Sequence, residues 1–270
     1  MERPSWAPAD VDIETPSIAR VYDYWVGGTH NFEVDRAVAR QVEEANPALP
    51  KTFRANRAFL RRAGRELAGL GIRQFLDVGS GIPAEHNVHD AVFAAAPDSK
   101  VVYTDIDPVA VAHGRAILAD EPRAAIFQGD LYKPKDIFEA PDTARLIDFD
   151  QPVGLILGAV LHFVPEENDP LALIRQFTDR LVPGSYLVLS HAGADEVPQA
   201  APNVAKSYGG AVSEVIWRST EQFTALFEGF QLIDPGVTPV TVWRPDADAD
   251  VDGLGAGAPM LAGAALKPVV

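Results

Sequence analysis

Two short segments of the sequence carry residues of the kind that hold a nucleotide. In the first, LDVGSG at 76–81, Gly79, Ser80 and Gly81 follow an apolar run and precede a helical stretch. Glycines at such a turn let the backbone bend tightly and approach a ligand that a Cβ atom would keep away. The second, VVYTD at 101–105, ends in Asp105, which follows Gly81 by 24 residues. At about this distance after the glycine loop, a nucleotide-binding sheet places the acid that accepts both ribose hydroxyls. Together the two segments predict a nucleotide site.

The side chains beside these segments refine the prediction. Asp77, directly before the glycines, suits a positively charged ligand better than a pyrophosphate, or it orders the loop through its backbone amides. We expect Ile106 to pack on one face of an adenine. Asp107 precedes Pro108, so it reads more simply as the N-cap of a helix than as a ligand contact.

A third acid follows the next predicted strand. Gly129, Asp130 and Leu131 stand where this edge of a sheet would meet an adenine, whose amino group could donate to Asp130. A turn made by the Gly-Asp pair is the alternative. The glycine loop also fits the looser dinucleotide fingerprint, with Ala84 at the third small position. A nicotinamide-dependent oxidoreductase is therefore a second interpretation.

The elements that must position these residues alternate in type. Short apolar runs separated by helical stretches are typical of parallel βαβ units buried on both faces, and so of an α/β fold. Five strands are predicted at 74–78, 100–104, 124–127, 153–157 and 186–190, with a closing pair at 231–233 and 240–243. Helices are predicted from 16 to the glycine pair at 27–28, and over 32–44, 52–70, 85–96, 108–118, 169–181 and 220–227.

Composition and helical pattern divide the chain into four predicted parts. Residues 1–15 are acidic and proline-rich and are expected to be disordered, and residues 16–70 form a helical cap or lid. Residues 71–245 form the α/β domain. Residues 246–270 are rich in Asp, Gly and Ala, which predicts a flexible tail.

Composition limits the classes of partner. With 23 Lys and Arg against 38 Asp and Glu, the formal charge of −15 repels phosphate backbones, so we expect no nucleic-acid partner. No apolar run approaches the ~20 residues that span a bilayer, and the N-terminus lacks a signal-peptide pattern, so we expect no membrane partner and a cytoplasmic location. Cysteine is absent, which excludes a thiolate metal site and a cysteine nucleophile.

The order of these motifs resembles the class I S-adenosylmethionine-dependent methyltransferases. More closely, the chain resembles a methyltransferase family long catalogued only as a domain of unknown function, and the resemblance covers about residues 15–245. It is carried by PSIARVYDYWVGG at 16–28, NF at 31–32, DR at 35–36, ANRAFLRR at 55–62, GIRQFLD at 71–77 and GSYLVLSH at 184–191. Where many class I enzymes have a third loop glycine, this chain has Pro83, which should stiffen the loop.

The resemblance implies a Rossmann-like, mostly parallel seven-stranded sheet with helices on both faces, and S-adenosylmethionine as cofactor. By position, it places Gly79, Ser80 and Gly81 at the methionine and ribose, Asp105 at the ribose, Asp130 and Leu131 at the adenine, and Ala159 to His162 in the wall beyond the fourth strand. We expect the polar cluster in the first helix and just beyond its end to fold over the cofactor as a lid; its members are Arg20, Tyr24, Gly27, Gly28 and Asn31.

A forked pair between an arginine and the methionine carboxylate is expected from Arg20 or Arg57, with a structural salt bridge as the alternative. Methyl transfer needs a general base only if the acceptor must lose a proton. Candidates are His162, His191 and His30, although a hydrogen-bonded structural histidine is the default interpretation of each.

The sequence does not indicate a metal site, and it does not identify the methyl acceptor. His86 and His89 have metal-ligand spacing but no third ligand nearby, so no metal is expected. The long segment 193–218 suggests a substrate cover in which Tyr208, Trp217 and Arg218 are the residues to examine. Three hypotheses remain: a methyltransferase acting on a small molecule, a non-catalytic protein that binds the same cofactor, and an NAD-dependent oxidoreductase.

Overall fold

One twisted sheet forms the centre of the molecule. The computed structural model describes residues 7, 11–83, 87–195, 214–246, 254 and 258–269. The main path through the sheet has the strand order β3-β2-β1-β4-β5-β8-β6, and β7 pairs with β8 off this path. The strands are β1 (Gln74–Val78), β2 (Lys100–Asp105), β3 (Ala124–Gln128), β4 (Gly154–Gly158), β5 (Tyr186–Ala192), β6 (Gln231–Leu232), β7 (Thr238–Pro239) and β8 (Met260–Leu266).

The first five strands are parallel, and β8 runs antiparallel to β5, β6 and β7. Successive side chains of a strand point to opposite faces of the sheet. Phe75 and Val101 accordingly join one hydrophobic cluster, while their neighbours Leu76 and Val102 join the other. Both faces are therefore buried, which explains the continuous apolar runs in the sequence.

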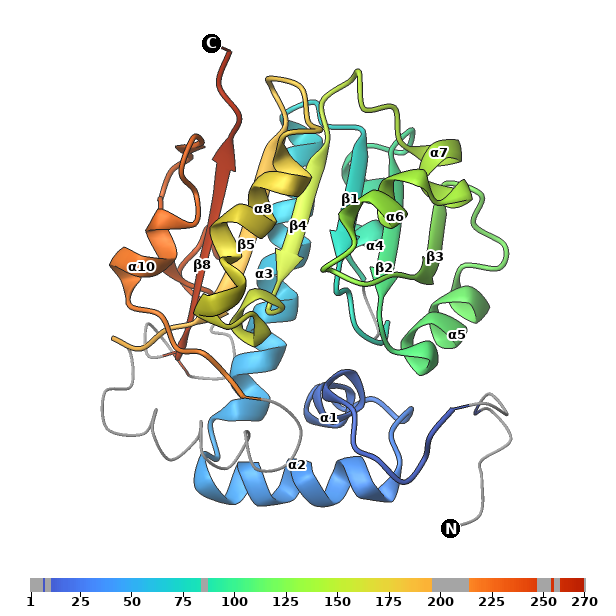
Figure 1. The fold of residues 1–270 in the computed structure, drawn as a ribbon, viewed down its shortest axis with the longest axis vertical. Coiled ribbons are helices and arrows are strands. Elements are labelled where there is room, and N and C mark those ends of the chain that lie inside the picture. Colours follow the sequence, from blue (N-terminus) through green and yellow to red (C-terminus); the bar gives the residue numbers. More distant parts are fainter. Residues whose placement is uncertain are drawn as a thin grey trace.

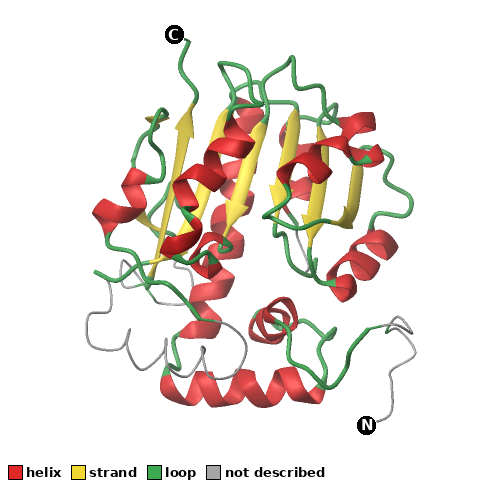
Figure 2. Cartoon of the chain, viewed as in Figure 1, coloured by secondary structure: helices red, strands yellow, loops and turns green. Residues whose placement is uncertain are grey.

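Helices cover both faces of the sheet, as Figure 2 shows. One face carries α3, α4 and α5, and the other carries α6, α7, α8 and α10. The helices are α1 (Ile18–Trp25), α2 (Glu33–Ala45), α3 (Leu49–Gly69), α4 (Val88–Ala95), α5 (Pro108–Ile117), α6 (Pro134–Glu139), α7 (Pro141–Leu146), α8 (Pro170–Thr178) and α10 (Thr220–Ala225), with the 3₁₀ turns η1 (Leu161–Phe163) and η2 (Glu166–Asn168). The mostly parallel sheet predicted from the sequence is confirmed.

The first two helices lie beyond the carboxyl ends of the parallel strands (Figure 1). Trp25 of α1 stacks on Phe53 of α3 with ring centroids 5.0 Å apart, and its Nε1 donates to the Ala39 carbonyl of α2. The buried Arg20 donates from Nε to Asp35 Oδ2 at 2.9 Å, which joins α1 to α2. These contacts hold α1 over the sheet edge.

Two boundary predictions are wrong. Residues 11–15 are ordered rather than disordered, because Val11 is buried and the Thr15 carbonyl accepts a bond from Arg20 Nη2 at 2.6 Å. The predicted flexible tail contains β8, which lies between β5 and β6 inside the sheet. The predicted strand at 240–243 is instead a turn, and the neighbouring β7 pairs with β8.

No helix in the part of the chain that the structure describes is both long and apolar enough to cross a membrane.

Candidate active site

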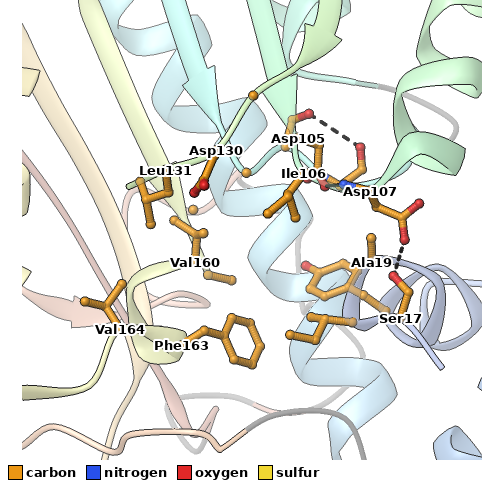
Figure 3. A pocket seen from close by; sticks show the side chains of 18 of the residues that line it. Ser17, Ala19, Asp105, Ile106, Asp107, Asp130, Leu131, Val160, Phe163 and Val164 are labelled. Carbon is orange, nitrogen blue, oxygen red and sulfur yellow. Dashed lines mark hydrogen bonds between the residues drawn. The ribbon is translucent and has the colours of Figure 1, made fainter. Parts of the chain in front are cut away.

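A cavity of about 460 Å³ lies at the carboxyl ends of β1, β2 and β4, under α1. This volume is within the range of small-molecule sites. Its walls are Ser17, Ile18, Ala19, Tyr22, Asn56, Arg57, Leu60, Gly79, Ser80, Gly81, Asp105, Ile106, Asp107, Pro108, Gly129, Asp130, Leu131, Tyr132, Gly158, Ala159, Val160, Phe163 and Val164. Figure 3 shows Leu131, Val160 and Phe163 on one side and Ser17 and Ala19 on the other, with Asp105 and Ile106 at the sheet edge.

The glycine loop after β1 needs both of its glycines. Gly79 and Gly81 have φ angles of +74° and +69°, a region that residues with a Cβ rarely adopt. A Cβ on Gly79 would also lie 2.7 Å from Val160 Cγ2. The Gly79 amide donates to the Thr104 carbonyl at 2.8 Å, which anchors the loop to β2.

Asp105 joins the two predicted segments directly. Its Oδ2 accepts from the Gly81 amide at 2.7 Å and its Oδ1 accepts from the Asp107 amide at 2.9 Å. A carboxylate has about four acceptor positions, so lone pairs remain for a ligand. Asp105 is 6% exposed, and burial raises the pKa of its carboxyl to about 6.

Asp107 is the N-cap of α5, as predicted. Its Oδ1 accepts from the Val109 amide at 2.7 Å. Its other oxygen accepts from the Ser17 hydroxyl and lies 3.5 Å from Arg20 Nη1. Asp107 therefore ties the start of α1 to α5 at the rim of the cavity (Figure 3).

The loop after β3 closes another side of the cavity. Gly129, Asp130 and Leu131 line it, and Asp130 Oδ1 accepts from the Tyr132 amide at 2.9 Å, so the predicted turn is present as well. Ile106 is 64% exposed at the cavity wall, which leaves an apolar surface free for a flat ligand.

The wall after β4 starts with a strained residue. Ala159 has a φ of +54°, and its amide donates to Ser190 Oγ at 3.0 Å. Non-glycine residues in this conformation cluster at functional sites. Val160, Phe163 and Val164 continue the wall. The predicted range 159–162 includes Ala159 and Val160, whereas Phe163 and Val164 were missed.

The N-terminal helices contribute residues to the cavity wall, but these are not the residues that were predicted. Arg20, Tyr24, Gly27, Gly28 and Asn31 do not line the cavity. Arg20 is held by Asp35 and Asp107, so the structural salt bridge replaces the predicted ligand contact. Asn31 Nδ2 donates to Asp23 Oδ2 at 2.8 Å, and a Cβ on Gly28 would clash with the Asp23 carboxylate. The contacts within this polar cluster stabilise the C-terminal end of α1 and the turn that follows it.

The residues that do face the cavity are mostly apolar. From α1 they are Ile18, Ala19 and Tyr22, and from α3 they are Asn56, Arg57 and Leu60. Arg57 Nη2 donates to the Ile82 carbonyl at 2.9 Å, and its guanidinium lies 5.2 Å from the Tyr22 ring centroid. The sequence shows the helical periodicity of α1 and α3. Periodicity alone does not distinguish the side of a helix that faces the cavity from the side that faces the core.

Asp77 lies behind the glycine loop rather than in the main cavity. With Arg57, Ser80 and Tyr103 it lines a small adjoining cavity of about 20 Å³. Burial raises the pKa of the Asp77 carboxyl to about 7, with the Arg57 charge acting in the opposite direction. The predicted direct contact with a ligand is therefore not found in the main cavity.

None of the three histidines proposed as bases lines the cavity. His191 belongs to β5 and is 0% exposed, and burial lowers its pKa to about 3. His162 in η1 is also buried, and burial lowers its pKa well below the usual range. His30 packs edge-on against His113 of α5. His162 was predicted both as a base and as a cofactor contact. Its position outside the cavity lining supports neither role.

The predicted substrate residues are also elsewhere. Arg218 is buried and binds the Leu161 and Val164 carbonyls at 3.1 and 3.2 Å, so it holds the turn that carries Phe163. Trp217 packs against the core. Tyr208 lies outside the described residues. No group of three or more His, Cys, Asp and Glu side chains placed to bind a metal occurs among those described.

Comparisons with known proteins identify a family and related structures. The model of a family described as S-adenosyl methyltransferase matches residues 4–268. A candidate methyltransferase from Thermobifida fusca is 38% identical, covering 98% of this chain and 100% of its own, with a TM-score of 0.91. A DUF574 family protein from Streptomyces avermitilis is 37% identical, covering 95% and 99%, with a TM-score of 0.91.

A more distant structure shares the fold alone. The plantazolicin methyltransferase BamL, solved with a triazolic desmethylPZN analogue and S-adenosylhomocysteine, is 10% identical. It covers 93% of this chain and 96% of its own, with a TM-score of 0.52. No curated protein matches the chain.

Proposed function

The chain belongs to the S-adenosyl methyltransferase family, and from that premise we propose that its main cavity seats S-adenosylmethionine beside a small-molecule methyl acceptor. The observation that carries the proposal is the hydrogen bond between the Gly81 amide and Asp105 Oδ2 at 2.7 Å. It brings the glycine turn and the acid to one wall of one cavity. This arrangement suits a nucleoside whose sugar meets the acid while its chain crosses the turn.

The residues present fit this cofactor. Asp105 keeps lone pairs for the ribose hydroxyls. Ile106 and Leu131 offer apolar surfaces to the adenine, and Asp130 offers a carboxylate to its amino group. Arg57 stands beside Gly81, where a Cβ would lie 3.2 Å from Arg57 Nη2. Of the two arginines predicted for the methionine carboxylate, Arg57 is therefore the one that the geometry supports.

The chemistry asked of the protein is mainly positioning. S-adenosylmethionine, when bound, supplies a methyl group on a positively charged sulfur that leaves as a neutral thioether. The chain's own part is to align the acceptor with that methyl group and to exclude water. Ala159, Val160 and Phe163 form the wall on that side, and α1 covers the opposite side. Tight alignment needs rigid walls, which the Asp107 and Ser190 contacts supply.

A small acceptor fits both the cavity and the charge of the molecule. The cavity lies under α1, whose Ile18 and Ala19 present apolar surface to it. The net charge of −15 disfavours a polyanionic acceptor. BamL, which shares the fold alone, was solved with a small-molecule analogue in place.

Calorimetry with S-adenosylhomocysteine tests the proposal, with NAD as the control ligand. We expect S-adenosylhomocysteine to bind and NAD not to bind. Exclusive binding of NAD would contradict the proposal and restore the oxidoreductase alternative. A screen of small amines, phenols and thiols for release of S-adenosylhomocysteine then separates an active enzyme from a protein that only binds the cofactor.

A further inference from the structure

The guanidinium of Arg218, a residue that is 2% exposed, uses all five of its N–H groups inside the protein. Nη1 donates to the Leu161 carbonyl at 3.1 Å and to His191 Nε2. Nη2 donates to the Val164 carbonyl at 3.2 Å and to Glu166 Oε1 at 2.7 Å, and Nε donates to the same Glu166 oxygen at 3.0 Å. Arg218 therefore acts on a ligand only through the residues that it holds.

The bond to His191 fixes Arg218 to the central sheet. His191 belongs to β5, and its Nδ1 lies 2.9 Å from the Ala192 carbonyl. Nδ1 must carry the ring proton, which leaves Nε2 to accept from Arg218. The backbone adds a second bond, from the Arg218 amide to the Ala192 carbonyl at 3.2 Å. The end of β5 thus sets the position of the guanidinium.

The other acceptors of Arg218 lie on the segment 161–166, which begins with η1. A single 3₁₀ turn has weak internal hydrogen bonds, so its position depends on contacts from outside. Phe163 and Val164 of this segment line the cavity, next to Val160 (Figure 3). The bonds from Arg218 therefore fix this wall of the cavity relative to β5.

We propose that Arg218 is a positioning residue for methyl transfer, which acts through η1 to hold Val160 and Phe163 on the side of the cavity where acceptor and methyl group meet. The inference rests on the proposed function and extends it to a residue outside the cavity. Alignment of the two reacting groups needs a wall that does not move. The ribose and adenine sides of the cavity follow β2 and β3, so Arg218 should not affect them.

Calorimetry with two ligands that differ by one methyl group tests this role. The ligands are S-adenosylmethionine and S-adenosylhomocysteine, and the proteins are the unaltered chain and Arg218→Lys. Lysine keeps the charge but lacks the planar fork, so it cannot bind all of these acceptors. We expect the preference for S-adenosylmethionine to fall about fourfold, the contribution of one buried methyl group. Adenosine, which lacks the methyl group, should bind both proteins equally.

Arg62 provides the matched control, because it is also 2% exposed and also binds backbone carbonyls. Its Nε and Nη2 donate to the Trp243 and Val240 carbonyls at 3.1 and 2.6 Å, and it does not line the cavity. Arg62→Lys makes the same substitution at the same degree of burial. It should lower the melting temperature but leave the preference between the two ligands unchanged.

Hydrogen exchange measures the position of the wall without a ligand. The Phe163 and Val164 amides donate within the turn, each at 3.1 Å. In Arg218→Lys we expect their exchange to accelerate about tenfold, the equivalent of one lost hydrogen bond. The Gly79 amide, which donates to the Thr104 carbonyl, should exchange as before.

A second variant serves if Arg218→Lys does not fold. Glu166→Ala removes two of the five bonds at a side chain that is 66% exposed, where water can replace the lost carboxylate. The preference for S-adenosylmethionine should then fall by about twofold, as for a partly exposed ion pair.

Unchanged preference or unchanged exchange in a folded Arg218→Lys overturns the assignment, and so does an equal loss of preference in Arg62→Lys. Unchanged preference in Glu166→Ala has the same meaning if Arg218→Lys does not fold. Each of these results leaves the proposed function intact. Failure of the unaltered chain to bind either ligand overturns both, so the two failures are distinguishable.

Discussion

At the scale of single residues, two buried carboxylates have raised pKa values: Asp105 in the cavity wall and Asp77 behind the glycine loop. Asp105 accepts two backbone N–H groups, which partly replace the water it has lost. For Asp77, the nearby Arg57 charge offsets part of the effect of burial. Both pKa values are raised, to about 6 and about 7, so both groups titrate close to neutral pH.

The affinity for S-adenosylhomocysteine should depend on the ionisation of Asp105. Ribose hydroxyls donate to the carboxylate, so protonation below its pKa of about 6 removes an acceptor. We expect affinity to fall roughly tenfold between pH 8 and pH 5, since one pH unit below a pKa leaves about a tenth of the group ionised. Titration calorimetry at both pH values measures the change.

The variant Asp105→Asn is the matched control for that pH series. It should bind about 1.5–3 kcal/mol more weakly at pH 8, the range for a hydrogen bond to a charged group. It should also lose the step between pH 8 and pH 5. Wild-type affinity in this variant would place the ribose elsewhere.

Asp77 affects stability in the opposite sense from a salt-bridged acid. Its folded pKa of about 7 lies above the ordinary value of 3.8, so stability is lost as pH rises from about 4 to about 7 and stays low above that. The cost at pH 8 is on the order of 4 kcal/mol. Asp77→Asn should therefore raise the melting temperature more at pH 8 than at pH 5.

Thermal melts of Asp98→Asn provide the comparison for this effect. Asp98 is 74% exposed and pairs with the half-exposed Arg73 at 3.1 Å, so its replacement removes one negative charge and one surface ion pair without relieving burial. Its effect on the melting temperature should be small at both pH values. Equal gains from the two variants would mean that the net charge of the chain, and not the burial of Asp77, limits stability.

The sequence predicted those side chains whose role is fixed locally. Gly79, Gly81 and Asp105 lie at the predicted cavity because a tight turn and a strand end are determined by short-range geometry. Asn56 and Phe163 were missed. Their place at the cavity depends on how α3 and η1 pack against the sheet, and no local pattern encodes that.

At the scale of elements, α1 has two faces with different tasks. Arg20 and Asp23, on one side, form the bonds that fix the helix and its terminal glycines. Ile18, Ala19 and Tyr22, on the other, line the cavity. We propose that this face is the lid that covers the cofactor. The polar side, which was predicted from the sequence as the lid, holds the helix in position.

Filling the cavity from α1 tests the lid. Ala19→Leu adds a larger side chain where the ligand would lie, and leucine is nearly as good a helix former as alanine. We expect S-adenosylhomocysteine affinity to fall at least about tenfold while the melting temperature changes little. Ala37→Leu, on the exposed side of α2, makes the same substitution away from the cavity and should leave affinity unchanged.

Normal affinity in a folded Ala19→Leu protein would show that the bound ligand does not reach α1. The lid would then have to be assigned to another element. Calorimetry on both variants, with thermal melts for folding, distinguishes these outcomes.

At the scale of the whole molecule, the last strand completes a sheet begun almost 200 residues earlier. β8 pairs with β5 over seven residues, from Tyr186 with Leu266 to Ala192 with Met260. Its small side chains look unlike a core strand, which is why the sequence suggested a flexible tail. The packing requires them, because a Cβ on Gly263 would lie 2.9 Å from Phe227 Cζ.

Removal of β8 should therefore prevent folding, even though no residue of β8 lines the cavity. A chain that ends at residue 257 leaves β5 with an unpaired edge. It also removes β8, the only strand among the described residues with which β6 and β7 pair. Non-local pairing of this kind must form before the sheet is stable. We expect loss of the cooperative thermal transition and of near-ultraviolet circular dichroism, with exposed apolar surface detected by dye binding.

A chain that ends at Lys267 is the control for this truncation. It keeps β8 and the two bonds from Lys267 Nζ to the Thr178 and Leu181 carbonyls, each 2.8 Å long. It loses only the three residues beyond, of which Val269 is largely exposed. This chain should melt like the 270-residue chain and bind S-adenosylhomocysteine. A cooperative transition in the shorter chain would show instead that the five parallel strands and their helices are a stable unit without β8.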